Sequence, residues 1–239
     1  MKFGVYSNGS FGPSVKLLQM ELDSLGYSVS IDGDYGPDTE AAVKLFQKHN
    51  GLVEDGIAGP ITLGKMFPND GTRDSISRAV APTALAEKVI EVARRYVGVR
   101  ETRGYNRSPE IDAWTKELGL DELGLSWCMI FVQHCYWVAS KELGVKDVLR
   151  PDTAGVLDLW YKVPKSWQIH PIDGLPGDIM IMDHGEGKGH TGIVTGYGAG
   201  VYDAIEGNTN VAGSPEGDGV YEKTRKYTEL KGLIRVPAL

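Results

Sequence analysis

The sequence predicts an α+β protein preceded by a small helical domain. Apolar residues recur at helical spacing in several segments before residue 161, and strand-like runs follow between residues 178 and 236. Helices first and an antiparallel meander later are typical of an α+β fold in which helices pack on the sheet. The chain has 239 residues and a hydrophobic share of 41%, enough for one large or two small domains.

The N-terminal stretch contains two copies of a turn that leads into a helix. The run DGDYGPDT at residues 32–39 is echoed by DGIAGPIT at residues 55–62. Glycine permits the left-handed backbone of such turns, and proline suits the first turn of a helix. An earlier helix is indicated by the spacing of Val15, Leu18, Leu22 and Leu25. We therefore expect a three-helix domain in residues 1–67, a linker in residues 68–83 and a second domain in residues 84–239.

This N-terminal unit resembles the peptidoglycan-binding domain type 1 family. The resemblance is carried by VKLLQ (15–19), DGDYG (32–36), Thr39, Ala42 and Val43, Phe46 and Gln47, Gly51 and Leu52, and DGIAG (55–59). It implies attachment to bacterial cell-wall peptidoglycan; the alternative is a helical domain whose Gly and Asp residues only build turns. Five Lys against eight acids give residues 1–67 a net charge of −3. Attachment to an anionic wall would then rely on shape and hydrogen bonds rather than on long-range attraction.

Cys128 is the candidate nucleophile of the second domain. It follows Trp127 at the start of a predicted helix, where free backbone N–H groups favour a thiolate. Cys135 lies on the same helix face, seven residues further on. A rise of about 1.5 Å per residue separates the two Cα atoms by roughly 10 Å, which is beyond disulfide reach. We expect Cys135 to act as a small apolar side chain.

The strand-like region supplies the candidate partners of this thiol. Residues 178–182 and 191–197 are predicted to form a hairpin around the glycine-rich loop 185–189, which places His190 at the mouth of the second strand. A third strand, 201–205, would deliver Glu206 and Asn208 at its end. A thiol hydrolase needs an imidazole to carry the proton and a third group to orient the ring. Adjacent antiparallel strands would bring His190 and Glu206 side by side, and the Cys128 backbone N–H would contribute to an oxyanion hole.

The second domain resembles the CHAP family of cysteine, histidine-dependent amidohydrolases and peptidases. The matching segments are SWCMIFV (126–132), PGDI (176–179), GHTGIVTG (189–196) and IEGNT (205–209). The resemblance implies a papain-like (NlpC/P60-type) fold with an antiparallel sheet, with Cys128 as nucleophile, His190 as base and acid, Glu206 as orienting group and Asn208 as accessory polar group. Thr191 stands where the family often has an aliphatic residue. No cofactor is implied, no calcium or other metal site is assigned, and Glu101 and Asn106 receive no role although their stretch resembles some members.

Two other interpretations remain open from the residues alone. Asp183, His184 and His190 would be the ligands of a zinc peptidase, although their spacing matches no established ligand pattern. A wall-binding protein with a catalytically silent cysteine domain is the second. A net charge of −7 with scattered basic residues argues against nucleic acid as a partner, and no apolar run approaches the length of a membrane span.

Together, these observations predict a peptidoglycan hydrolase that cleaves an amide of the stem peptide or cross-bridge, as an N-acetylmuramoyl-L-alanine amidase or an endopeptidase. The first residues lack the apolar core of a secretory signal. We therefore expect a phage-lysin-like enzyme that is made in the cytoplasm and acts at the cell wall. The sequence does not indicate an oligomeric state.

Overall fold

The computed structural model describes residues 5–67, 83–120, 123–147, 149, 153–198, 201–210 and 217–237. The chain divides into two compact units, with the boundary at residues 81 and 82. The predicted linker, residues 68–83, lies outside the described residues apart from Thr83. No helix in the described part of the chain is long and apolar enough to cross a bilayer.

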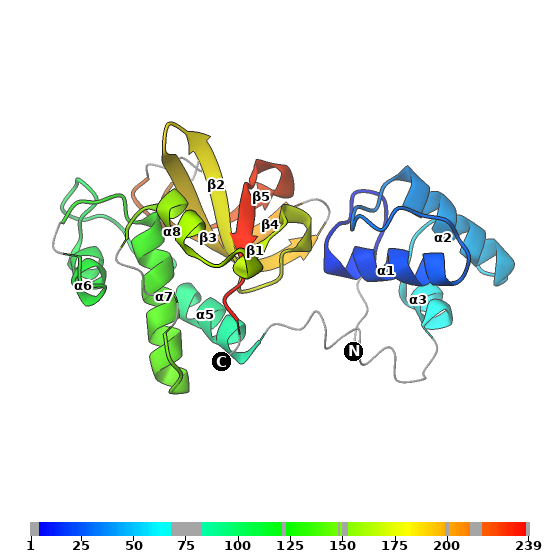
Figure 1. Ribbon diagram of the computed structural model, residues 1–239, viewed down its shortest axis with the longest axis horizontal. Helices are drawn as coiled ribbons and strands as arrows, with labels where there is room; N and C mark the ends of the chain where they lie inside the picture. Colours follow the sequence, from blue (N-terminus) through cyan, green and yellow to red (C-terminus); the bar gives the residue numbers. More distant parts are fainter. Residues whose placement is uncertain are drawn as a thin grey trace. The chain divides into compact units, whose positions relative to one another are not determined.

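The described part of the N-terminal unit contains three helices that each begin at a proline (Figure 1). They are α1 (Pro13–Ser24), α2 (Pro37–His49) and α3 (Pro60–Met66). The residue before each proline is a glycine, so the chain turns sharply before it enters the helix. Ala42 and Phe46 of α2 are buried in the core of this unit. Leu45 is also apolar and lies directly before Phe46, but its side chain is 45% exposed.

The sequence repeat is also a structural repeat, because a buried glutamine from the preceding helix organises each turn. Oε1 of Gln19 in α1 accepts the Gly33 backbone N–H at 2.7 Å. Nε2 of Gln19 donates to Asp32 Oδ1 at 2.8 Å, to the Asp34 carbonyl at 2.9 Å and to Thr39 Oγ1 at 3.0 Å. The side chain therefore fixes the first turn to the helix before it and the helix after it.

The second turn repeats the same contacts with Gln47 of α2. Oε1 of Gln47 accepts the Gly56 backbone N–H at 2.9 Å. Nε2 of Gln47 donates to Asp55 Oδ1 at 2.8 Å, to the Ile57 carbonyl at 3.1 Å and to Thr62 Oγ1 at 3.1 Å. We call these two arrangements the twin glutamine turns.

In the second unit, helices pack against an antiparallel sheet whose strands differ in length, which confirms the predicted α+β class. Its helices are α5 (Ala84–Arg95), α6 (Pro109–Glu117), α7 (Cys128–Leu143) and α8 (Val156–Lys162), with 3-10 turns η1 (Lys165–Trp167), η2 (Pro171–Asp173) and η3 (Tyr227–Glu229). Helix α7 contacts α5, α6 and strand β4, and α8 contacts β2 (Figure 1). The sequence did not predict α6, although Ser108 caps it by accepting the Ile111 N–H.

The sheet has six strands in the order β1-β6-β2-β3-β4-β5. The strands are β1 (Gln168–Ile169), β2 (Ile179–Gly185), β3 (Lys188–Gly198), β4 (Val201–Thr209), β5 (Gly219–Lys226) and β6 (Gly232–Ile234). Strands β2 to β5 form the expected meander, but β6 pairs with β2 on the other side of it. The C-terminal strand thus inserts between β1 and β2 rather than extending the meander.

Two boundaries differ from the sequence prediction in ways that affect the site. Strands β2 and β3 run into the predicted glycine-rich loop and leave a tight turn at Glu186 and Gly187. Strand β4 continues to Thr209, so Glu206 and Asn208 lie within a strand rather than after one. Both polar residues are fully buried there, which a loop position would not have given them.

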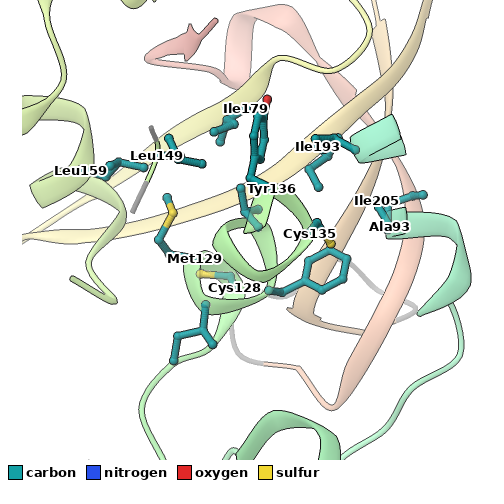
Figure 2. Close-up of a cluster of buried hydrophobic side chains, with 14 of the residues drawn as sticks. Ala93, Cys128, Met129, Cys135, Tyr136, Leu149, Leu159, Ile179, Ile193 and Ile205 are labelled. Atoms are coloured by element: carbon teal, nitrogen blue, oxygen red, sulfur yellow. The ribbon is translucent and has the colours of Figure 1, made fainter. Parts of the chain in front are cut away.

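The core of this unit lies between α7 and the sheet. Figure 2 shows Cys135 and Tyr136 of α7 among Ile179, Ile193 and Ile205, which come from three neighbouring strands. Cys128 and Cys135 are both free and buried. Helix α7 is therefore held along its length by apolar packing, and its first residue is held with it.

Candidate active site

Helix α7 begins at Cys128, and the residue before it is anchored by a hydrogen bond. The indole Nε1 of buried Trp127 donates to Glu101 Oε1 at 3.0 Å. The other oxygen of Glu101 accepts the Asn106 backbone N–H at 3.0 Å. Glu101 and Asn106, which the sequence left without a role, thus fix the loop that leads into the helix. The Cys128 thiol sits on a rigid support in the first turn, where the helix dipole favours negative charge.

A cleft of about 540 Å³ opens above this thiol. One side is lined by the segment 154–156 that leads into α8, and the other by residues 187–189 at the turn between β2 and β3. Ser126 and His184 also line it. Gly189 keeps the cleft open, because a Cβ at this position would lie 3.0 Å from Val156 Cβ. The cleft therefore gives a substrate access to the otherwise buried thiol.

The structure brings His190 and Glu206 together on neighbouring strands β3 and β4. Nε2 of His190 lies 3.0 Å from Glu206 Oε2, and both side chains are almost completely buried. Gly192, two residues after His190, leaves room for the acid, because a Cβ there would lie 2.6 Å from Glu206 Cγ. The geometry therefore matches the side-by-side placement expected from the sequence.

The charge state of His190 follows from its neighbours. Burial lowers the pKa of His190, but hydrogen bonding and charge interactions with Cys128 and Glu206 outweigh burial and raise it from 6.5 to about 9. Nδ1 of His190 has no nitrogen or oxygen hydrogen-bond partner among the described residues. Since Nε2 is taken by Glu206, Nδ1 is the ring nitrogen left for Cys128. The imidazole is predominantly protonated at neutral pH, as a partner of a thiolate would be.

A fourth charged group, Arg225 of β5, was not singled out from the sequence. Its Nε donates to Glu206 Oε1 at 2.7 Å and its Nη2 to Glu206 Oε2 at 2.6 Å. Burial raises the pKa of Glu206, but hydrogen bonds from Arg225 and His190 outweigh burial and hold it below its ordinary value. A strand arginine alternating with exposed polar residues gives no sequence signal of this contact, which only the pairing of β4 and β5 creates.

Asn208 is buried in β4 with a left-handed backbone, at a φ of 53°. Neither its Oδ1 nor its Nδ2 has a hydrogen-bond partner among the described residues. Left-handed backbone is uncommon for a residue other than glycine, and an unpaired buried amide costs free energy. This combination is typical of functional sites, where strain and unmet hydrogen bonds persist because they serve the chemistry.

Two other ionisable residues of α7, His134 and Cys135, are buried in packed surroundings. His134 stacks on Trp114 with ring centroids 5.1 Å apart, and its Nε2 lies 2.8 Å from the Tyr96 hydroxyl. Burial lowers the pKa of His134 to about 4, so the ring is neutral at physiological pH. Burial raises the pKa of Cys135, which keeps this thiol protonated and apolar.

Asp183, His184 and His190, the ligands of the zinc alternative, do not form a metal-binding cluster. Asp183 pairs with Lys231 at 2.9 Å, and His190 pairs with Glu206. Within the described ranges, no three His, Cys, Asp or Glu side chains are grouped closely enough to hold a metal ion. His184 lines the cleft beside Cys128 instead.

The fold and the site define a class of protein: an α+β domain that brings a helix-terminal cysteine to a buried histidine and glutamate, the set of groups used by thiol hydrolases. Comparison with known families agrees. Residues 11–66 match a family described as a putative peptidoglycan binding domain, and residues 120–208 match the CHAP domain. The chain therefore joins a peptidoglycan-binding domain to a CHAP domain, as its sequence motifs predicted.

Individual relatives share only part of their length with this chain. It is 45% identical over 67 residues to the zinc D-Ala-D-Ala carboxypeptidase of Streptomyces albus G, which covers 27% of this chain and 26% of that protein. It is 40% identical over 58 residues to the N-acetylmuramoyl-L-alanine amidase CwlM of Mycobacterium tuberculosis, covering 24% and 14%. Among solved structures, a Burkholderia AP3 phage endolysin is 30% identical over 45% of this chain and 42% of that one, with a TM-score of 0.27.

Proposed function

We propose that this protein is a peptidoglycan hydrolase that cleaves an amide bond of the stem peptide or cross-bridge with Cys128 as its nucleophile. The observation that supports the proposal best is the 3.0 Å contact of His190 with Glu206, together with the interaction of His190 with Cys128, within the segment that matches the CHAP domain. The match to a peptidoglycan-binding domain supports the cell wall as substrate. Relatives named as amidases and a structural neighbour named as an endolysin support the same reaction class.

In this mechanism, the Cys128 thiolate attacks the amide carbonyl carbon in the cleft and forms a C–S bond. Negative charge moves to the carbonyl oxygen, which the backbone N–H groups at the start of α7 stabilise. Protonated His190 then gives its proton to the leaving nitrogen, and the C–N bond breaks to leave a thioester. Neutral His190 next takes a proton from water as the water attacks the thioester. The acid product leaves, and the thiolate and imidazolium are restored.

Glu206 orients His190 in this proposal by accepting the Nε2–H, which directs Nδ1 toward Cys128. Asn208 is the accessory polar group, because its buried amide has no hydrogen-bond partner among the described residues and would hydrogen-bond a polar group of the substrate. The N-terminal domain would hold the enzyme on the wall, and tethering raises the local concentration of substrate at the cleft. The protein would then act at the cell wall, either released during lysis or secreted.

The test is a comparison of Cys128→Ala with the matched control Cys135→Ala on purified cell walls. We expect Cys128→Ala to release no new amino groups and still to sediment with walls, whereas Cys135→Ala retains turnover. Mass spectrometry of the digest then identifies the bond, since an amidase frees the first alanine and an endopeptidase cuts within peptides. Turnover at the wild-type rate by Cys128→Ala would refute the nucleophile assignment.

The alternatives of a zinc enzyme and of a silent domain predict different results for the wild-type protein. Iodoacetamide should stop lysis under our proposal, whereas loss of lysis with a chelator alone would favour zinc. Wall binding without lysis in the untreated protein would favour the catalytically silent module.

A further inference from the structure

We infer that Arg225 is a positioning residue whose two-point hold on Glu206 keeps His190 in the orientation that serves Cys128. The inference rests on the proposed thiol chemistry, which it extends by a fourth member on β5. Arg225 does not belong to any of the sequence motifs that were identified in the two domains.

The contact is a bidentate pair in a dry environment. Nε and Nη2 of Arg225 donate to the two oxygens of Glu206 at 2.7 Å and 2.6 Å. The Arg225 side chain is 15% exposed and that of Glu206 is 0% exposed. Planar guanidinium binds carboxylate through two parallel hydrogen bonds, which fix direction as well as distance. A lysine ammonium would supply the charge without this fork.

One oxygen of the acid is shared by both partners. Oε2 of Glu206 accepts from Arg225 Nη2 and lies 3.0 Å from His190 Nε2. The plane in which Arg225 holds the carboxylate therefore sets the direction from which His190 can donate. If the carboxylate turned, the Nε2–H would lose its acceptor, and if the carboxylate became protonated, the acceptor would be weaker. In both cases Nδ1 would be held less firmly toward the thiol.

The strand register brings Arg225 and Glu206 onto the same face of the sheet. In the register of β4 and β5, Arg225 lies opposite Tyr202, and Glu206 lies opposite Tyr221. Ala204 is the residue between Tyr202 and Glu206 on the same face, because side chains alternate along a strand. Arg225 therefore reaches Glu206 diagonally across the two strands. Gly192 on the other side leaves room for the acid.

Several charged groups act on this pair. Arg225 faces Glu206 and, at longer range, Glu229, while Glu206 faces Arg225 and His190. Cys128 of α7 acts on His190 from the opposite side. Removing Arg225 would leave buried Glu206 with His190 as its single charged partner among these groups, so the carboxylate would be protonated more readily.

The test compares Arg225→Met and Arg225→Lys with Arg235→Met, all in a Cys135→Ala background that leaves Cys128 as the single thiol. Arg235 is the matched control, because its Nε and Nη2 hold buried Asp178 at 3.0 Å and 2.7 Å in the same unit. The readouts are thermal melting, the kinetics of wall hydrolysis, and the rate of Cys128 alkylation by iodoacetamide between pH 4 and 10.

We expect Arg225→Met to move the onset of Cys128 alkylation to higher pH and to lower kcat on the order of tenfold to a hundredfold, with KM changed much less. Arg225→Lys should recover part of both effects, because it restores charge without the second hydrogen bond. Arg235→Met should lower the melting temperature and leave the alkylation profile where it is in the parent.

Folded Arg225→Met with the parental profile and kcat would overturn the inference. If Arg225→Met does not fold, the decision falls to Arg225→Lys, and a parental profile in that variant would overturn the two-point hold. Alkylation reports on Cys128 and His190 without any wall substrate. A shifted profile in a protein that hydrolyses no peptidoglycan would therefore refute the proposed function and leave the role of Arg225 standing.

Discussion

The twin glutamine turns make a specific prediction about the N-terminal domain. In Gln47→Leu, the Gly56 backbone N–H loses its only acceptor among the described residues. The three acceptors of Gln47 each keep another hydrogen bond: Asp55 from the Ile57 N–H, the Ile57 carbonyl from the Gly59 N–H, and Thr62 through its own donation to Ile57. The substitution therefore leaves the Gly56 N–H without an acceptor and removes the three hydrogen bonds that Nε2 of Gln47 donates.

An unsatisfied buried donor costs about 1–3 kcal/mol, and each lost hydrogen bond about 0.5–1.5 kcal/mol net. Allowing for the apolar gain of burying leucine, we expect Gln47→Leu to destabilise the domain by about 2–4 kcal/mol. A single core of this size rarely supplies more than about 3–5 kcal/mol. On these figures about 1 kcal/mol of stability or less remains, so the variant domain should unfold at low urea concentrations. Gln19→Leu should match it, because Gln19 makes the equivalent bonds to the first turn.

The assay can watch the two units separately in the intact chain. All five tryptophans lie between residues 114 and 167, so tryptophan fluorescence reports on the catalytic unit, while far-UV circular dichroism reports on both. In urea, Gln47→Leu should move the N-terminal part of the dichroism transition to much lower urea concentration and keep the parental fluorescence midpoint. It should also weaken sedimentation with walls while Cys128 is alkylated at the parental rate.

Lys48→Leu is the control, because it introduces the same side chain at the next, exposed position of α2. Such surface changes usually stay within about 0.5 kcal/mol. If Gln47→Leu and Lys48→Leu unfold at the same urea concentration, the glutamine does not organise the turn, and the reasoning fails.

Three further outcomes are expected at the active site. Hydrolysis should fall as pH rises through about 9, because the raised pKa of His190 keeps the ring protonated below that pH. The same proton stabilises the folded protein fully below about pH 6.5, and this contribution to the free energy of unfolding should be lost as pH rises from about 6.5 to about 9. A pH–rate profile without this alkaline limb would contradict the assignment. Gly192→Ala should lower kcat on the order of tenfold with wall binding intact, because its Cβ would displace Glu206, and unchanged kcat would count against the pair. Gly189→Val should raise KM by narrowing the cleft beside Val156, and an unaltered KM on walls would place the substrate elsewhere.

The parts of the fold that follow local patterns could be predicted from the sequence. Helix α7 and the β2–β3 hairpin show their periodicity directly, and Cys128 and His190 lie at their ends. Helix α6 was missed although Ser108 and Pro109 mark its start, because its apolar positions are few.

The parts that depend on contacts between distant segments could not be predicted. The pairing of β6 with β2 joins segments separated by about fifty residues, and no local pattern records it. The polar end of β4 looked like a loop, because polar residues in a strand are usually exposed, whereas Glu206 and Asn208 are fully buried. Arg225 belongs to the site only through the register of β5 on β4.

The site is assembled from successive segments: the thiol from α7, the imidazole from β3, the carboxylate from β4 and the guanidinium from β5. A one-residue slip of β5 would turn Arg225 to the other side of the sheet. A chain that has been synthesised only as far as Asn208 carries the nucleophile, the histidine and the acid but not the residue that holds the acid. The reactivity of Cys128 would therefore mature late, after the sheet has closed, so an unfinished chain would be a poor hydrolase inside the cell that makes it.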